Sequence, residues 1–238
     1  MRLVAWNVNY NGNRRALEEN VSLLRPLGAD ILVLSETAAP HSGNILNARW
    51  TGERNPGLAI IALTGLNLTP HPDNAAIPPL MAAYKVSGHV AFELLAVWPV
   101  QRKGGSSYHE ILMAALDRYT HVVGSCRAIM AGDCNSSTRV SNQRDTHPLF
   151  VKRAESLGLI SAYHEQKGEQ HGVETVATYR HNCGPIRDFH IDYCFVAKQL
   201  NAFAKLRVLN DAVWAERSDH FPLVLDVRDE ALRPAPVS

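Results

Sequence analysis

The chain has 238 residues, of which 46% are hydrophobic and 20% are charged, a composition typical of a globular protein with a sizeable core. Lys and Arg number 24 against 23 Asp and Glu, which gives a formal charge of +1. This balance argues against a protein that coats nucleic acid through a broad basic surface, although a local basic groove is compatible with it.

The four cysteines are Cys126, Cys134, Cys183 and Cys194, and none forms a C-x-x-C pair. The usual patterns of zinc ribbons and thioredoxin-like sites are therefore absent. Met1 leads directly into an apolar run without a basic segment, and no stretch reaches the roughly 20 apolar residues of a membrane helix. The sequence predicts a soluble cytoplasmic protein with reduced thiols and no membrane partner.

The first elements predict a strand, a helix and a second strand. Residues 2–8 read as a short strand, and apolar residues near helical period predict a helix over 14–25. Residues 31–34 are continuously apolar, which is typical of a strand buried on both faces. This βαβ-like start favours a sheet that is covered by other layers.

Helices and strands interleave through the rest of the chain. Strands are predicted over 58–63, 82–86, 89–99, 127–131, 189–196 and 222–227. Helices are predicted over 109–119 and 150–157. Because no repeat, low-complexity block or linker interrupts them, we expect one α/β domain over residues 1–238.

Polar side chains interrupt or follow the predicted strands at five places. Alone, each has an ordinary explanation, because Asp or Asn after a strand usually bonds the backbone of a turn, and a Glu there is usually solvated. Together they supply the hard oxygen and acid–base groups that phosphoryl chemistry uses. These residues are Asn7, Glu36, Asp133 with Asn135, Asp192, and Asp219 with His220.

The carboxylates predict a site for a hard cation, since Mg²⁺ prefers one or two carboxylates together with water and substrate phosphate. Glu36 can supply such a ligand, with Asn7 and Asp219 as candidates for further oxygen donors.

The remaining polar residues predict acid–base chemistry. Asp133 and Asn135 are separated by one residue, so in extended backbone they face the same side. One could orient an attacking water while the other donates a hydrogen bond to a phosphate oxygen. A histidine beside a phosphate needs a fixed tautomer, and Asp192 is the natural candidate to hold His220 in it.

The chain resembles the endonuclease/exonuclease/phosphatase superfamily, which includes exonuclease III-type abasic-site endonucleases, DNase I and inositol polyphosphate 5-phosphatases. The resemblance rests on five segments in family order, which span essentially the whole chain: Trp6–Asn9, Leu34–Thr37, Gly132–Asn135, His190–Tyr193 and Ser218–His220. It implies a DNase I-like four-layer α/β/β/α sandwich, two packed mixed sheets flanked by helices, with the site at one edge where loops converge.

The resemblance also implies a role for each residue in a metal-dependent attack of water on a phosphate ester. The cofactor is expected to be Mg²⁺, with Mn²⁺ as an alternative. Glu36 resembles the principal metal ligand, assisted by Asn7 and Asp219; Asp133 resembles the residue that activates water, Asn135 a phosphate binder, and His220 with Asp192 the dyad that faces the phosphate.

The substrate side departs from the family pattern. Trp98 stands about where the abasic endonucleases have a tyrosine, and an indole can stack on a base or sugar but cannot act as an acid. The alternative for Trp98 is a half-buried core position.

A polar segment over 163–172 contains two histidines and two glutamates. It fits either a second metal site or a solvated loop on the substrate side, and its irregular intervals favour the loop. Tyr179 and Arg180, which follow it, are candidates to touch a phosphate or base. Other loop cations that could contact a phosphodiester backbone are Arg102, Lys103, Arg139, Arg144 and Arg187.

These observations favour a metal-dependent nuclease that acts on DNA or RNA. A phosphatase or phosphodiesterase of a small phosphorylated molecule is the second possibility, and a catalytically dead binding module on the same scaffold is the third. The sequence leaves the oligomeric state open.

Overall fold

A computed structural model of the chain describes residues 1–41, 47–76, 80–181 and 187–233. Its strands form two six-stranded sheets and a two-stranded ribbon. The first sheet contains β1 (Arg2–Asn7), β2 (Ile31–Thr37), β3 (Ala48–Thr51), β4 (Gly57–Ala62), β13 (Ala204–Val208) and β14 (Leu223–Val227). The second contains β5 (Asn67–Pro70), β6 (Met81–Ser87), β7 (Phe92–Val97), β8 (Ala128–Asp133), β9 (Leu159–Ser161) and β12 (Asp192–Ala197). The ribbon is β10 (Tyr179–His181) with β11 (Arg187–Phe189).

Both sheets are mixed. The strand orders are β13-β14-β1-β2-β4-β3 and β5-β6-β7-β8-β12-β9. In the first sheet β1 runs parallel to β2 and antiparallel to β14. In the second, β7 runs parallel to β8, and β12 runs antiparallel to β8.

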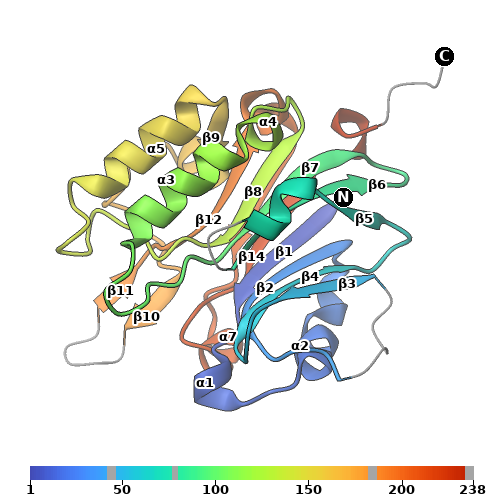
Figure 1. Ribbon diagram of the computed structural model, residues 1–238, viewed down its shortest axis with the longest axis horizontal. Helices are drawn as coiled ribbons and strands as arrows, with labels where there is room; N and C mark the ends of the chain where they lie inside the picture. Colours follow the sequence, from blue (N-terminus) through green and yellow to red (C-terminus); the bar gives the residue numbers. More distant parts are fainter. Residues whose placement is uncertain (42–46, 77–79, 182–186, 234–238) are drawn as a thin grey trace.

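Helices cover the outer face of each sheet (Figure 1). The first sheet is covered by α1 (Tyr10–Asn13), α2 (Leu17–Leu24) and α7 (Ala212–Ala215). The second is covered by α3 (Tyr108–Arg118), α4 (Thr120–Val123) and α5 (Thr146–Ser156). Helix α6 (Ala162–Lys167) follows β9, and short 3₁₀ helices lie at Arg25–Leu27, Pro72–Ala76, Lys198–Phe203 and Asp229–Ala231.

The side chains of β1 alternate between two hydrophobic cores, one on each face of the first sheet. Leu3 and Ala5 lie in the large core between the two sheets, whereas Val4 and Trp6 lie in a smaller core together with residues of α2 and α7. Strands β2 and β4 divide their residues in the same way. Sheets with both faces buried need cover on each side, which confirms the predicted four-layer α/β sandwich.

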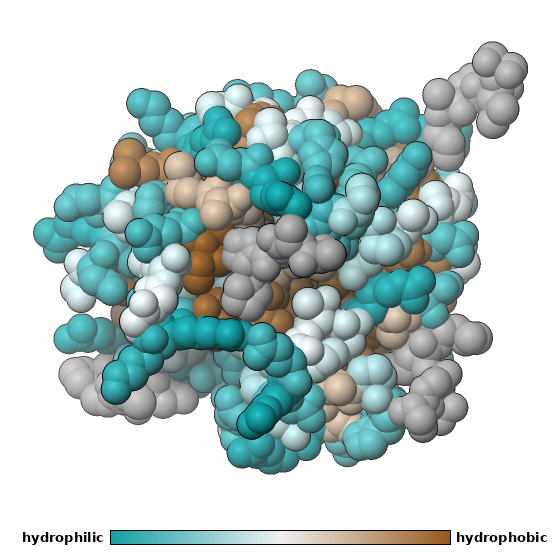
Figure 2. All heavy atoms as spheres, in the orientation of Figure 1, coloured by the Kyte–Doolittle hydropathy of each residue, from teal (hydrophilic) through white to brown (hydrophobic). Residues whose placement is uncertain are grey.

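The outer surface on one side of the molecule is mostly hydrophilic, and hydrophobic residues show mainly near its middle (Figure 2). Within the described residues, no helix has the length and apolar character needed to cross a membrane. Cys126, Cys134 and Cys194 are free thiols, and Cys183 lies outside the described residues.

The long elements match the sequence predictions, with shifted ends. The expected helix over 14–25 begins only at Leu17, because the chain first makes the separate turn α1. The expected helix over 150–157 begins earlier, at Thr146. The expected strand over 189–196 is divided between β11 and β12.

The prediction of a solvated loop over 163–172 is wrong for the first part of this segment. Residues Ala162–Lys167 form helix α6, and the side chains of Tyr163 and His164 are buried. The sequence pattern missed this helix because six residues are too few to show a helical period.

Candidate active site

The candidate residues meet at one edge of the sandwich, where β1, β2 and β8 end. The register places Asn7 beside Ser35 across the parallel pair β1 and β2. In the other sheet Asp133, the last residue of β8, is paired with Asp192, the first residue of β12. The ends of these paired strands therefore place their polar residues at the same edge of the sandwich.

A β-bulge brings Glu36 into this edge. The register between β2 and β4 shifts between Leu34 and Thr37, and Glu36 has a φ of 51°. Positive φ is uncommon for residues other than glycine and often marks a functional position. The bulge interrupts the alternation of side chains between the two faces of the sheet and so changes the direction of the Glu36 carboxylate.

Asn7 connects the two sheets through its side chain. Its Nδ2 donates to Oε1 of Glu36 at 3.0 Å and to Oδ2 of Asp133 at 2.9 Å. Its Oδ1 accepts from the backbone N–H of Asn9 at 3.0 Å. Asn7 is 1% exposed, and its amide links the buried carboxylate of Asp133 to the half-buried carboxylate of Glu36.

Asp133 and Asn135 do lie together, but the reason given by the sequence is wrong. The backbone is not extended, because Asn135 has a left-handed φ of 49°. The turn lets the N–H of Asn135 donate to Oδ1 of Asp133 at 2.8 Å, and its Nδ2 donates to Oδ2 at 3.1 Å. Asp133 therefore accepts three hydrogen bonds when the bond from Asn7 is included.

Gly132 is required for Asp133 to reach this position. Its φ is +140°, and a Cβ on it would stand 2.1 Å from the backbone oxygen of Val97. We expect Gly132→Ala to lower the free energy of unfolding by about 3 kcal/mol, because the backbone of β7 must move or the strand must distort. Urea unfolding measures this change, with Gly65→Ala as a control, since a Cβ at Gly65 meets nothing within 4 Å although its φ is also positive.

His220 and Asp192 form the predicted pair. Nδ1 of His220 lies 2.9 Å from Oδ2 and 3.1 Å from Oδ1 of Asp192, and both residues are buried. The indole Nε1 of Trp6 donates to the backbone oxygen of His220 at 3.0 Å, and Ser218 Oγ accepts from the N–H of His220 at 3.1 Å. The ligand atoms of Asp133, Asp192 and His220 lie within 4.8 Å of one another.

The charges in this site are strongly coupled. Burial, together with the charge of Asp192, raises the pKa of Asp133 to about 7. Burial also raises the pKa of Glu36, and the charges of Asp219 and Asp192 add to that rise. For His220 burial lowers the pKa, but the charge and hydrogen bond of Asp192 outweigh it and raise the pKa to about 10. Carboxylates thus lie close enough together at this edge to raise the pKa of Glu36 and of Asp133.

A cavity of about 670 Å³ borders Glu36, and Trp98 and Arg102 also line it. Trp98 is 5% exposed and packs in the core between the sheets. It is therefore more buried than the half-buried core position that is the alternative to stacking on a base or sugar, and only an edge of its side chain can meet a ligand in this cavity.

The two candidates on β10 lie on different sides of the ribbon. The ring of Tyr179 lies 4.5 Å from that of His220, and Tyr179 lines a cavity together with Asn135. Arg180 lines a separate cavity with Asp219, and its guanidinium lies over the ring of Phe221 at 5.6 Å. Strand alternation accounts for this separation.

Tyr108 is a site residue that the sequence did not reveal. It is the first residue of α3 and lines the same cavity as Asn135 and Tyr179. Burial raises the pKa of Tyr108, and the charges of Asp133 and Glu36 raise it further. A phenol next to a helix cap has no sequence pattern that marks it as part of a site.

No protein-family model matches the sequence, and no curated protein matches it. Solved structures do match along nearly the full chain. A 3′ phosphatase, NExo, from Neisseria, bound to a product DNA hairpin, is 18% identical with a TM-score of 0.71, and the match covers 96% of this chain and 99% of that one.

Two further structures match in the same way. The endonuclease domain of TRAS1, a telomere-specific non-LTR retrotransposon, is 16% identical with a TM-score of 0.69, covering 95% of this chain and 98% of that one. An AP endonuclease from Archaeoglobus fulgidus is 16% identical with a TM-score of 0.68, covering 95% and 99%. The chain therefore shares the fold of these structures, a DNase I-like sandwich of two sheets flanked by helices.

Proposed function

We propose that the chain is a divalent-metal-dependent phosphodiesterase that hydrolyses DNA. The observation that carries this proposal is the joined set of carboxylates, amides and imidazole at the sheet edge, held by the bonds of Asn7 to Glu36 and Asp133 and by the pair of His220 with Asp192. The fold supports it, since structures with this fold include an AP endonuclease and a DNA-bound 3′ phosphatase.

The residues present fit a hard cation such as Mg²⁺, with Mn²⁺ as the alternative. Glu36 would be its principal ligand, assisted by Asp219, because carboxylate oxygens are the ligands that a hard cation prefers. Asn7 would assist by turning its Oδ1, which accepts from the N–H of Asn9, toward the ion. When bound, the cation polarises the phosphoryl group and stabilises the leaving oxygen.

The protein side chains would divide the remaining work. Asp133 would accept the proton of the attacking water, since its pKa of about 7 suits a general base near neutral pH. Asn135 would donate to a phosphate oxygen, and His220, kept positive by Asp192, would face the developing charge on the phosphate.

Arginines around the site favour a polymeric phosphodiester over a small one. Arg102 lines the cavity beside Glu36, while Arg139 and Arg187 line the cavity beside Asn135 and Tyr179. Cations on both sides of the reacting groups suit a backbone that passes across them. A small phosphorylated molecule remains the second candidate, because a cavity of about 670 Å³ is large enough to hold one.

The test is cleavage of single-stranded, duplex and abasic DNA, of RNA, and of a small chromogenic phosphodiester, with Mg²⁺, with Mn²⁺ and with chelator. We expect DNA cleavage that chelator abolishes and that Glu36→Gln lowers at least about 100-fold, since a metal ligand is lost. Glu155→Gln, an exposed position on α5, is the matched control.

Turnover of the small diester alone would replace the DNA proposal with the second candidate. Absence of any hydrolysis, with Mg²⁺ still bound in titration calorimetry, would identify a binding module on this scaffold.

A further inference from the structure

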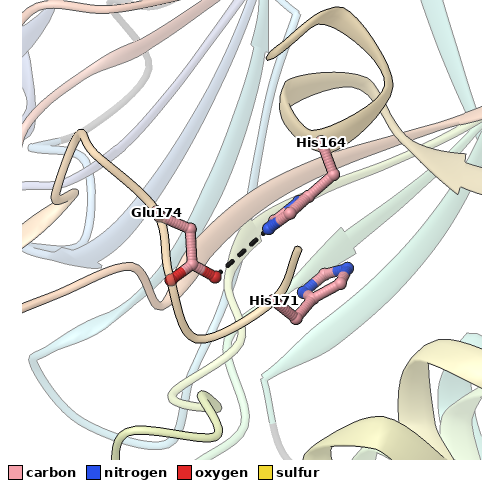
Figure 3. Close-up of side chains that lie close together, drawn as sticks. All are labelled: His164, His171 and Glu174. Carbon is pink, nitrogen blue, oxygen red and sulfur yellow. Dashed lines mark hydrogen bonds and ion pairs between the residues drawn. The ribbon is translucent and has the colours of Figure 1, made fainter. Parts of the chain in front are cut away.

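A second cluster of ligand-type side chains lies between α6 and the segment that follows it. Its members are His164 on α6, and His171 and Glu174 beyond the end of that helix (Figure 3). One ligand atom from each lies within 4.8 Å of the other two. Nε2 of His164 and Oε1 of Glu174 are 3.1 Å apart, which is the spacing of two ligands on one small metal ion.

The chain reverses sharply to bring these residues together. Gly168 ends α6 with a left-handed φ of 67°, so the following residues return over the helix. Gly172 has a φ of +97°, and a Cβ there would stand 2.1 Å from Oγ1 of Thr138. Only glycine fits at this contact, which fixes His171 and Glu174 on either side of it.

The cluster lies mostly below the surface, with His171 half-buried, and it is incompletely bonded. The side chains of Glu174 and His164 are 2% and 8% exposed. Oε2 of Glu174 and Nε2 of the nearby His190 are both buried and have no hydrogen-bond partner among the described residues. An unpartnered buried carboxylate oxygen costs free energy, and a bound cation removes that cost.

Other side chains contact the Nδ1 atoms of the two imidazoles. Nδ1 of His164 lies 2.7 Å from Oγ of Ser161. Nδ1 of His171 lies 3.0 Å from Nε2 of His147, whose own Nδ1 lies 2.9 Å from Oγ of Ser136. Histidine ligands of metal ions are characteristically fixed in this way through their second ring nitrogen.

We propose that His164, His171 and Glu174 form a second metal site, which binds Zn²⁺ or a similar transition-metal ion. Two imidazoles and one carboxylate are a zinc donor set, and imidazole distinguishes it from the oxygen-rich edge that suits Mg²⁺. Three protein ligands leave one coordination position for water or a substrate group.

The site would brace the segment that carries Asn135. His147 contacts Ser136, which directly follows Asn135, and the hydroxyl of Tyr193 on β12 donates to the backbone oxygen of Ser136 at 3.1 Å. An ion at the cluster therefore cross-links α6 to the returning segment and, through His147, to the loop after Asp133. The two imidazole rings are stacked with centroids 3.5 Å apart and planes at 16°, so the ring of His171 must tilt out of the stack, about its contact with His147, when both coordinate.

The test is Zn²⁺ binding by the full chain after metal removal, measured by equilibrium dialysis in excess Mg²⁺ with metal analysis. His171→Ala and the near-isosteric Glu174→Gln are each expected to bind one equivalent fewer than wild type at concentrations that saturate it, with affinity about 100-fold lower. His121→Ala, an imidazole 52% exposed on α4, is the matched control and keeps the full stoichiometry.

Thermal unfolding gives a second measurement. Zn²⁺ is expected to raise the midpoint of the wild type and not that of Glu174→Gln, because only a ligand of the native state stabilises it. Circular dichroism confirms that the variants are folded before the comparison.

Two results overturn the proposal. One is wild-type protein that binds no Zn²⁺ at micromolar concentrations. The other is Zn²⁺ that is lost in His220→Ala but kept in His171→Ala, which would place the ion at the active-site edge. Neither result depends on whether the protein cleaves DNA. The metal-site proposal is therefore tested independently of the proposed function.

Discussion

Replacing Asp133 with asparagine is expected to lower kcat for DNA cleavage by about 10⁴-fold, the upper range for loss of a general base. Asp133 is 1% exposed and stands where three N–H groups converge on its carboxylate. Burial and the charge of Asp192 raise its pKa to about 7, which makes it a better proton acceptor than an ordinary carboxylate. An amide of the same shape cannot accept that proton.

The fold is expected to survive this substitution. Oδ1 of the new amide can still accept from the N–H of Asn135, a bond of 2.8 Å in the wild type. The new NH₂ group faces the Nδ2 donors of Asn7 and Asn135, which costs stability, but loss of the negative charge relieves the repulsion with Asp192. We therefore expect a thermal midpoint within a few degrees of the wild type.

Single-turnover cleavage with saturating Mg²⁺ measures the effect on the chemical step. Asp145→Asn is the matched control, because Asp145 is exposed and its side chain makes no capping hydrogen bond at the start of α5. A loss of less than about tenfold in Asp133→Asn would remove Asp133 from the role of general base.

The fold was predictable because its central strands carry strong local patterns. Residues 31–34 are continuously apolar and become β2, buried on both faces. By contrast, β10 and β11 have three residues each. So short a strand has no period to detect, and its pairing depends on residues far away in the sequence.

The site was predictable in its residue types and less so in its geometry. Asn7 and Asp133 stand at strand ends, close to where the sequence predicts them. Asp192 begins β12, whereas the sequence predicts it inside a strand over 189–196. The bulge at Glu36 and the left-handed turn at Asn135 are backbone features set by tertiary contacts. They decide which atoms meet, and neither has a signature in the sequence beside it.

The sequence likewise could not reveal that His164, His171 and Glu174 form a cluster. Intervals of seven residues between His164 and His171 and three between His171 and Glu174 would suit one face of a continuous helix, but α6 ends at Lys167. They meet because the chain reverses at Gly168. A ligand set that spans such a reversal becomes visible only when the loop is placed in space.

Replacing Asp192 with asparagine is expected to lower kcat by about 10⁴-fold at neutral pH, because the amide no longer holds the imidazole of His220 in one tautomer or stabilises its charge. Nδ1 of His220 lies 2.9 Å from the carboxylate of Asp192, and both side chains are buried. The pair is therefore shielded from the solvent screening that weakens surface ion pairs.

The pH dependence separates this role from a purely structural one. Burial lowers the pKa of His220, while Asp192 first, and then Asp133 and Asp219, raise it to about 10. Activity that needs the imidazolium is therefore present below that pKa and lost as pH rises through it. Asp192→Asn removes the largest influence that raises this pKa, so the alkaline limb of the kcat profile moves to lower pH.

The stability of the metal-free protein is also expected to fall as pH rises. A histidine whose pKa is raised by folding stabilises the native state fully below its unfolded pKa of about 6.5, and this contribution disappears as pH rises toward 10. The thermal midpoint of the wild type should thus fall between pH 7 and 10 by more than that of Asp192→Asn, with Asp145→Asn following the wild type. An alkaline limb that stays in place in Asp192→Asn would show that the charge of His220 does not take part in the reaction, since Asp192 is the largest influence that keeps this buried imidazole protonated.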